Sequence, residues 1–166
     1  MNRLPANRET GAPAVVWVVN DAWADGRAGS LQCGLRALPP EITGVVVHAV
    51  DHPDVRPETV AALVAAHQAT DAGVPAAPTL VPRKPAEPSI VLPVYRDHRG
   101  HPVLLARSVW PEVFALAADD SLRTVVHRDP TRLRDIEVND PGIHRNRNER
   151  EASDITPASH PQKGER

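Results

Sequence analysis

The sequence predicts an α/β protein built in three layers, with helices on both faces of a mostly parallel sheet. Two observations lead to this fold class. Three apolar runs, at residues 14–19, 45–50 and 90–95, have the composition of buried strands. Continuous apolar runs of this kind are typical of strands that are covered on both faces. Segments with leucine and valine at helical spacing lie between the runs, and strands that alternate with helices favour a parallel sheet.

Length and charge restrict the class of protein further. The 166 residues suit one domain, and the net charge of −2 gives no electrostatic reason to expect nucleic acid or an anionic membrane as a partner. The single cysteine, Cys33, excludes an internal disulfide and fits a reducing compartment. No apolar run approaches the ~18 residues of a membrane-spanning helix. Residues 1–11 lack the apolar stretch of a signal peptide, so we expect a cytoplasmic protein.

The first apolar run, residues 14–19, ends in a polar pair and is followed by a loop with two glycines. Ser30 is predicted to be the N-cap of a helix that Pro39 and Pro40 stop. Gly26, Gly29 and Ser30 could bring backbone N–H groups close to an anion at the start of that helix. An ordinary loop before a helix explains the same residues, and the sequence pattern favours that explanation.

The second run, residues 45–50, ends abruptly in Asp51. His52 precedes a proline and is therefore pushed toward extended geometry, which ends the strand here. Ligands of open α/β sheets bind at the C-terminal edge of the strands, and a carboxylate there can hold a hard cation such as Mg²⁺. The alternative is that Asp51 only ends a strand or caps the next helix.

The remaining elements follow from the same periodicities. A helix is predicted from Pro57 to Thr70, with His67 as a partly exposed residue at its end rather than a ligand. The proline-rich stretch 71–89 is predicted to be a long excursion. Residues 90–95 and 101–105 form a predicted hairpin around a charged turn. Short helices are expected at 110–116 and 121–127, and a half-exposed strand at 134–138. His98 and His101 lack the cysteine or acidic partners of a zinc site.

The predicted organisation is one folded domain, residues 13–145, between a disordered leader, residues 1–12, and a polar disordered tail, residues 146–166. The chain begins on a strand that has the composition of a central one. This suggests that a part of the fold upstream is missing.

Four segments, taken in their order and spacing, resemble the MobA-like NTP transferase family, and within it the molybdenum cofactor cytidylyltransferase type. They are residues 18–20 with 26–35, residues 47–53, residues 91–103 with Arg99-Gly100-His101-Pro102, and residues 136–145. The resemblance implies a three-layer, Rossmann-like nucleotidyltransferase fold, here incomplete at the N-terminus. It also implies transfer of a nucleotidyl group from an NTP, CTP or GTP, to the phosphate of molybdopterin, with Mg²⁺ as cofactor.

The resemblance assigns roles to seven residues. Asp51 matches the metal-binding aspartate of the family's Asp-x-Pro motif. Gly29, Ser30 and Leu31 match the loop and helix start that face the nucleotide base, and Gly100, His101 and Pro102 match the motif on the acceptor side. Nucleotidyl transfer concentrates negative charge between the reactants, so a cation and N–H donors suit the reaction.

Two departures from the family concern catalysis. The Gly-rich loop Leu-Ala-Ala-Gly-x-Ser-x-Arg-Met-Gly, which cradles the triphosphate, is absent from the sequence, and so is the lysine that follows it. The family's late metal-binding motif Asp-Ile-Asp-Thr-Pro aligns with residues 146–150, where Asn146 and Asn148 replace both aspartates and Arg147 lies between them. Asp51 is then the one certain carboxylate ligand left, and we expect weak Mg²⁺ binding.

The sequence therefore predicts a diverged nucleotidyltransferase-family chain that is impaired or inactive when isolated. A non-catalytic accessory or binding protein and a fragment of a split nucleotidyltransferase are the alternatives. Apolar surface left by the incomplete fold predicts a homodimer or a partner chain.

Overall fold

The computed structural model describes residues 15–71 and 88–147. The predicted leader, most of the proline-rich excursion and the end of the predicted tail lie outside the described residues. The described part forms four α-helices and five strands, which in chain order are α1 (Arg27–Arg36), β1 (Gly44–Val47), α2 (Pro57–Asp71), β2 (Ile90–Tyr95), β3 (His98–Arg99), β4 (Val103–Ala106), α3 (Trp110–Phe114), α4 (Leu122–Arg128) and β5 (Leu133–Glu137). Four 3₁₀ helices complete it: η1 (Trp23–Asp25), η2 (Arg107–Val109), η3 (Pro130–Arg132) and η4 (Pro141–His144).

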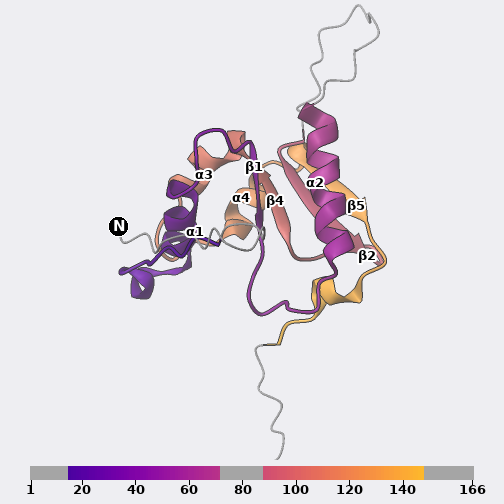
Figure 1. Ribbon diagram of the computed structural model, residues 1–166, viewed down its shortest axis with the longest axis horizontal. Coiled ribbons are helices and arrows are strands. Elements are labelled where there is room, and N and C mark those ends of the chain that lie inside the picture. The colour runs from indigo at the N-terminus through magenta and orange to yellow at the C-terminus, as the bar shows by residue number, and fades with distance from the viewer. Residues whose placement is uncertain (1–14, 72–87, 148–166) are drawn as a thin grey trace, which may run out of the picture.

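The sheet is mixed. β4 pairs with β1 and with β2 in antiparallel register, whereas β5 runs parallel to β2 along its other side. β1, β2 and β5 therefore point the same way, and β4, the return strand of the hairpin after β2, lies between β1 and β2 (Figure 1). The predicted α/β class is confirmed. The direction shared by β1 and β2 means that their C-terminal ends meet at one edge of the sheet.

Helices cover both faces of the sheet, as the continuous apolar strands predict. Val45 and Val47 pack with α1, α3 and α4 in the larger core cluster, whereas Val46 packs with α2 in the smaller one. Leu104 likewise belongs to the α2 side and its neighbour Leu105 to the other side. Side chains alternate between the faces of a strand, so neighbouring residues of these runs reach different core clusters. The three layers are visible in Figure 1.

The predicted strand at residues 14–19 is wrong for the residues that the structure describes. Only Val18 makes an isolated bridge, and Val15, Trp17 and Val19 are 61%, 66% and 56% exposed. β-branched and aromatic residues suit a pleated surface that is at least half buried, but they form a strand only beside a suitable neighbour.

α1 begins at Arg27, four residues before Leu31. Gly26, which precedes it, has a φ of +146°, and a Cβ built on it would lie 1.8 Å from the carbonyl oxygen of Ala118. Glycine is the residue that tolerates such a conformation and such a close backbone approach, so the chain enters α1 at Gly26 and packs against the loop after α3.

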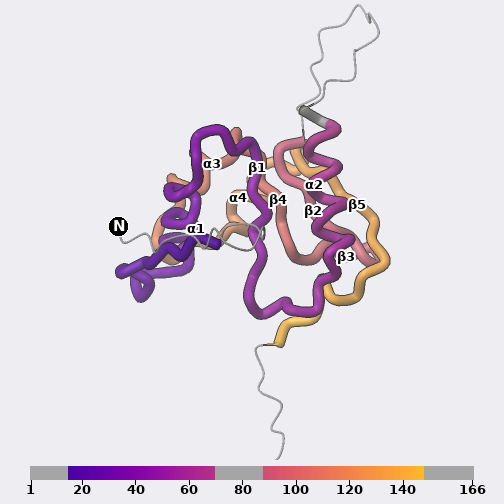
Figure 2. Tube along the Cα trace, in the orientation of Figure 1, coloured from indigo at the N-terminus to yellow at the C-terminus, as the bar shows by residue number. Residues whose placement is uncertain are grey.

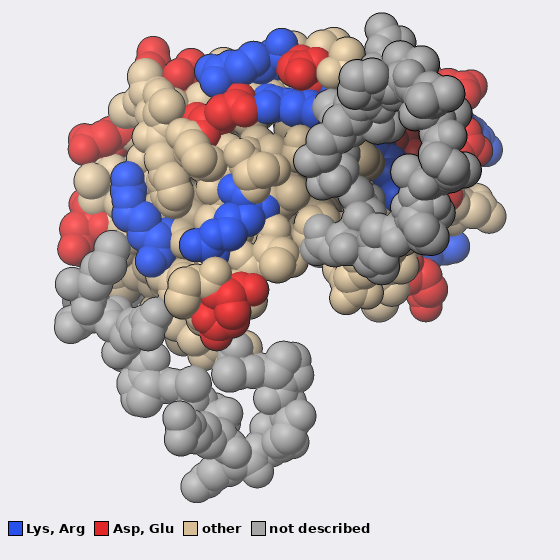
Figure 3. Space-filling model, turned by 90° about the horizontal axis from the view of Figure 1, so that it is seen from above, with Lys and Arg blue, Asp and Glu red and all other residues tan. Residues whose placement is uncertain are grey.

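Charge is distributed without a dominant sign. On the face shown in Figure 3, acidic and basic side chains are interspersed over the described surface. An interspersed pattern makes no continuous basic field of the kind that attracts polyanions. Within the described residues, no helix has the length and apolarity that a membrane crossing requires.

Candidate functional site

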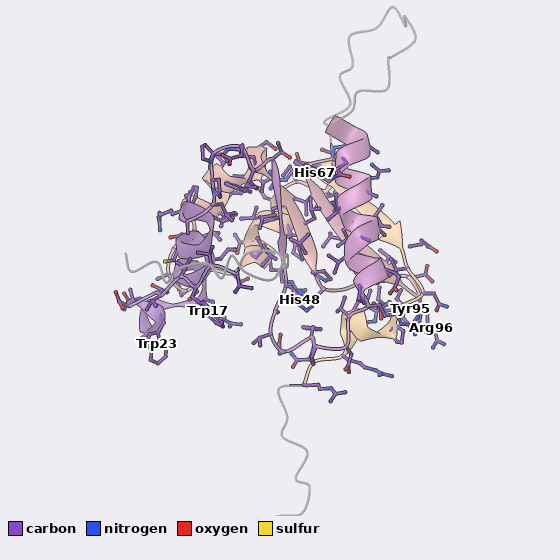
Figure 4. The ribbon with its side chains drawn as sticks, viewed as in Figure 1. Trp17, Trp23, His48, His67, Tyr95 and Arg96 are labelled. Atoms are coloured by element: carbon purple, nitrogen blue, oxygen red, sulfur yellow. The ribbon has the colours of Figure 1, made fainter. Side chains whose placement is uncertain are left out.

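Asp51 lies just past the C-terminal end of β1, in a turn closed by a hydrogen bond from the N–H of His52 to the carbonyl of Ala49, 3.1 Å. His48, at the start of this loop, and Tyr95, at the end of β2, both lie toward the lower end of the molecule in Figure 4. This placement follows from the shared direction of β1 and β2. It puts the Asp51 loop at the same edge as the hairpin tip.

The segment after η4 lies directly on the Asp51 loop, although almost a hundred residues separate them (Figure 2). The side-chain amide of Asn146 donates to Asp51 Oδ2 at 2.9 Å, and the backbone N–H of Arg147 donates to the Asp51 carbonyl at 2.7 Å. The Arg147 guanidinium holds both carboxylate oxygens of Asp54, at 3.0 and 3.1 Å. The second acid of this loop is thus neutralised by an arginine of the chain itself.

Gly100, His101 and Pro102 join the same site from the other side. The N–H of Gly100 donates to Pro93 and that of His101 to the carbonyl of Ile143, both at 3.0 Å. A Cβ on Gly100 would lie 2.5 Å from that carbonyl oxygen, so the absence of a side chain lets the loop pack against η4. The His101–Pro102 bond is cis.

Two histidines connect the loops. The rings of His52 and His101 are 4.5 Å apart between centroids, and His52 Nε2 lies 3.9 Å from Asp51 Oδ1. Burial lowers the pKa of His101, with a further lowering by the nearby His52 and a smaller, opposing effect of Asp51. His101 is therefore neutral at pH 7, with one ring nitrogen to donate and one to accept. His52 is 7% exposed, and its Nδ1 has no hydrogen-bond partner among the described residues.

Gly29, Ser30 and Leu31 are placed elsewhere. They lie inside α1, so the prediction of Ser30 as N-cap is wrong. The Ser30 hydroxyl accepts a hydrogen bond from the Asn20 side chain at 3.0 Å, and Asn20 also receives the N–H of Ala22. Within residues 15–71 and 88–147, no hydrogen bond joins Ser30 to Asp51 or His101. The structure brings together the Asp51 loop and the Gly100-His101-Pro102 loop, and it ties the α1 residues to the segment before η1.

The described residues do not fit a resident Mg²⁺ ion. Mg²⁺ prefers octahedral oxygen ligands, usually including carboxylates. Asp51 Oδ2 already accepts from the Asn146 amide, and Asp54 is bound to Arg147. In the described part of the chain, no three His, Cys, Asp or Glu side chains form a group that could hold a metal.

Asn146→Asp is expected to create a divalent-ion site, because it places a second carboxylate at a position 2.9 Å from Asp51 in the present structure. Without metal the variant should melt at a lower temperature than the unchanged chain, since like charges then face each other. Mg²⁺ at ~10 mM should raise its melting temperature by about 3 °C or more. Asn139→Asp, at another exposed position, is the control. An equal response of both variants to Mg²⁺ would contradict this reading of the site.

Sequence reasoning did not find the roles of His52, Asp54 and Arg145. Asp54 follows Asp51 at a spacing of three, which is a signal for a shared loop. Arg145 lies 4.0 Å from Asp54, and Arg147 pairs with it. Arg145 is the last residue of the predicted domain, and Arg147 lies in the predicted disordered tail, where no hydrophobic periodicity predicts a fold. For Asn146 and Arg147 that prediction is wrong, because both residues are bound to the Asp51 loop.

Comparison with known proteins gives a family model and two solved structures. Residues 2–133 match the family model of the MobA-like NTP transferase domain. The chain is similar to the crystal structure of Rv0371c from Mycobacterium tuberculosis H37Rv, with a TM-score of 0.53 and 27% identity over 68% of this chain and 50% of that one.

A second similar structure is a homolog of that protein from Mycobacterium sp. strain JC1, with a TM-score of 0.51 and 22% identity over 66% of this chain and 46% of that one. At this identity the likeness shows the fold alone. The chain spans about half the length of the solved structures it matches. No curated protein matches it.

Proposed function

The chain belongs to the MobA-like NTP transferase family, and from this premise we propose that it carries the acceptor side of a nucleotidyltransferase site of the molybdenum cofactor type. The observation that carries the proposal is the contact between the Asp51 loop and the Gly100-His101-Pro102 loop, whose histidine rings are 4.5 Å apart. Both loops belong to the resemblance, and the fold brings them to one edge of the sheet.

The proposed reaction joins a phosphate oxygen of a molybdopterin-type acceptor to the α-phosphorus of CTP or GTP, and pyrophosphate leaves. Neutral His101 would donate a hydrogen bond to the acceptor phosphate without a fixed positive charge, and Asp51 would face the reacting groups from β1. In this proposal any Mg²⁺ at Asp51 is held loosely, and Gly29, Ser30 and Leu31 face the nucleotide base. The proposed compartment is the cytoplasm.

Equilibrium binding tests the proposal. Molybdopterin is expected to bind the purified chain, and His101→Ala is expected to weaken that binding about tenfold, the cost of one hydrogen bond to a charged group. CTP and GTP should bind at least tenfold more weakly than the acceptor. Thr124→Ala, at an exposed position of α4 outside the lining of this site, is the control and should leave acceptor binding unchanged. Nucleotide binding that is tighter than acceptor binding would contradict the assignment of the acceptor side.

A second candidate function is that of a non-catalytic binding protein of the same family. The observation that favours it is the engagement of both acids of the Asp51 loop by Asn146 and Arg147. In that case the acceptor would bind and stay unmodified under every combination of nucleotide and metal.

The exposed apolar side chains before α1 predict association with a second copy or with a partner chain. Trp17 and Trp23, at the lower left of Figure 4, are 66% and 74% exposed, beside Val15 and Val19. Large apolar side chains that are exposed to solvent are candidates for interaction sites. Light scattering is expected to give a mass above that of the monomer, and the double variant Trp17→Ser, Val19→Ser should lower it. Val50→Ser, at a residue that is 96% exposed in the Asp51 loop, should leave the mass unchanged. A monodisperse monomer at high concentration would exclude self-association.

A further inference from the structure

A cavity of about 400 Å³ lies between the sheet and α4, next to the Gly100-His101 loop. Its lining has two chemical parts. The apolar part is formed by Leu92, Val103, Leu122 and Val126, and the nitrogen-bearing part by Arg99, His101, Arg123 and His127. Apolar walls with a few convergent polar groups are typical of small-molecule sites.

The charge of the lining is positive. Among the described residues that line the cavity there is no carboxylate. The positive charge of Arg99 is neutralised, because its guanidinium donates to both carboxylate oxygens of Asp135 at 2.8 Å. Arg123 differs from Arg99 in this respect. Among the described residues it contacts no carboxylate, and its side-chain hydrogen bond runs from Nε to His127 Nε2 at 3.2 Å.

Arg123 and His127 can together present hydrogen-bond donors to a ligand in this cavity. The two residues are four apart on α4 and therefore share one face of the helix. Because Arg123 Nε donates to Nε2 of His127, the other ring nitrogen, Nδ1, is the one that can donate. Among the described residues, no other hydrogen bond engages the terminal nitrogens of Arg123 or Nδ1 of His127. Guanidinium groups match the geometry of phosphate oxygens.

We propose that this cavity binds a phosphate monoester of a flat, largely apolar group. Arg123 and His127 hold the phosphate, and the ring lies over Leu122 and Val126. The inference rests on the proposed function, which it deepens, because it assigns phosphate-binding residues on α4 to the acceptor side. Leu122 and Val126 flank Arg123 and His127 along α4 by one residue each, so the apolar and the cationic part of the lining are in reach of one small molecule.

Titration with a fluorescent aryl phosphate tests this inference without nucleotide or metal. 4-Methylumbelliferyl phosphate is the probe, and 4-methylumbelliferone is the same ring without the phosphate. The phosphate probe is expected to bind more tightly than the phosphate-free ring, and more weakly as salt is raised. Arg123→Gln should weaken its binding about tenfold, as expected for the loss of one charge-assisted contact. Arg123→Lys, which keeps the charge, should recover part of the affinity.

The matched control is Arg27→Gln, which removes the same charge from an exposed position at the start of α1. Equal weakening in both variants, an unchanged affinity in Arg123→Gln, or no saturation by the phosphate probe would each overturn the inference. Arg123 is exposed, so its substitution should leave the melting temperature unchanged. The proposed function is decided separately, by molybdopterin binding and its response to His101→Ala, so acceptor binding that ignores Arg123 would reject this cavity alone.

Discussion

The purified 166-residue chain, incubated with Mg²⁺, each of the four NTPs and molybdopterin, is expected to release pyrophosphate far more slowly than ~1 per second, the lower end of ordinary enzymatic rates. The sequence lacks the Gly-rich loop of the family's pattern and the lysine that follows that loop in the family. The 166 residues therefore do not supply the backbone N–H groups of that loop as donors to the triphosphate. Charge-assisted contacts to phosphate are worth ~1.5–3 kcal/mol each. The loss of several of them weakens nucleotide binding by orders of magnitude.

The electrostatics at Asp51 add to this loss. Asn146, which the resemblance aligns with an aspartate of the family's late metal-binding motif, places an amide N–H on Asp51, and Arg147 binds Asp54. Both contacts occupy carboxylate oxygens that a cation would otherwise take. Asp51→Ala is therefore expected to change the slow background rate little. Turnover of ~1 per second or more that disappears in Asp51→Ala would show that this account of the departures is wrong.

A second polypeptide separates the two remaining explanations for low turnover. If the chain is one part of a split enzyme, a polypeptide that carries the Gly-rich loop should restore pyrophosphate release when mixed with it. If the chain is a binding protein, the mixture should stay inactive while the acceptor still binds. An assay of the mixture with each NTP decides between them.

The central elements of the fold could be predicted because local pattern and burial agree there. The valines of β1 and the apolar run of β2 are buried or half-buried on both faces, as continuous β-branched runs predict. Helix α2, with bounds Pro57–Asp71, matches a prediction of 57–70, since Pro57 suits the first turn. The run at residues 14–19 has the same composition but lacks the burial. An apolar composition is therefore not sufficient for a strand, because a strand also needs a neighbouring strand to pair with.

The site could be predicted only in pieces. Asp51 and the Gly100-His101-Pro102 loop were each identifiable from sequence, but their contact depends on β4 lying between β1 and β2. The pairing of Arg147 with Asp54 could not be predicted, because it joins residues 93 apart in sequence. Ser30 has the residue type of an N-cap, yet the close approach of Gly26 to Ala118 fixes the start of α1 earlier. Long-range packing decided each of these outcomes.

Asp140→Ala is expected to lower the free energy of unfolding by about 3–5 kcal/mol, because three donors lose one charged acceptor and each unsatisfied donor costs ~1–3 kcal/mol. Asp140 lies between β5 and η4, and it is 2% exposed. Its carboxylate accepts the N–H of Arg56 at 2.8 Å, the hydroxyl of Thr59 at 2.7 Å and the N–H of Gly142 at 2.8 Å. These bonds fix the start of α2 to η4, so truncation removes the shared acceptor of three donors.

The pH dependence gives an independent check. Burial alone would raise the pKa of Asp140, but the hydrogen bonds from Arg56, Thr59 and Gly142 outweigh it and hold the pKa below its ordinary value. The stabilisation is therefore complete above the unfolded-state pKa of ~3.9 and is lost as pH falls through the lower pKa of the folded state. Urea unfolding at several pH values should show the difference between Asp140→Asn and the unchanged chain shrinking below about pH 4.

Asp135→Ala is the control for this prediction. Asp135 pairs with Arg99, but the side chain of Asp135 is 43% exposed, and exposed ion pairs contribute less than ~1 kcal/mol. A small loss is therefore expected for Asp135→Ala and a large one for Asp140→Ala, both measured at neutral pH. Equal losses, or a loss below ~1 kcal/mol for Asp140→Ala, would mean that Asp140 does not hold η4 against the start of α2. In that case the Gly100-His101 loop, which hydrogen-bonds to Ile143 of η4, should stay in position when the Asp140 carboxylate is removed.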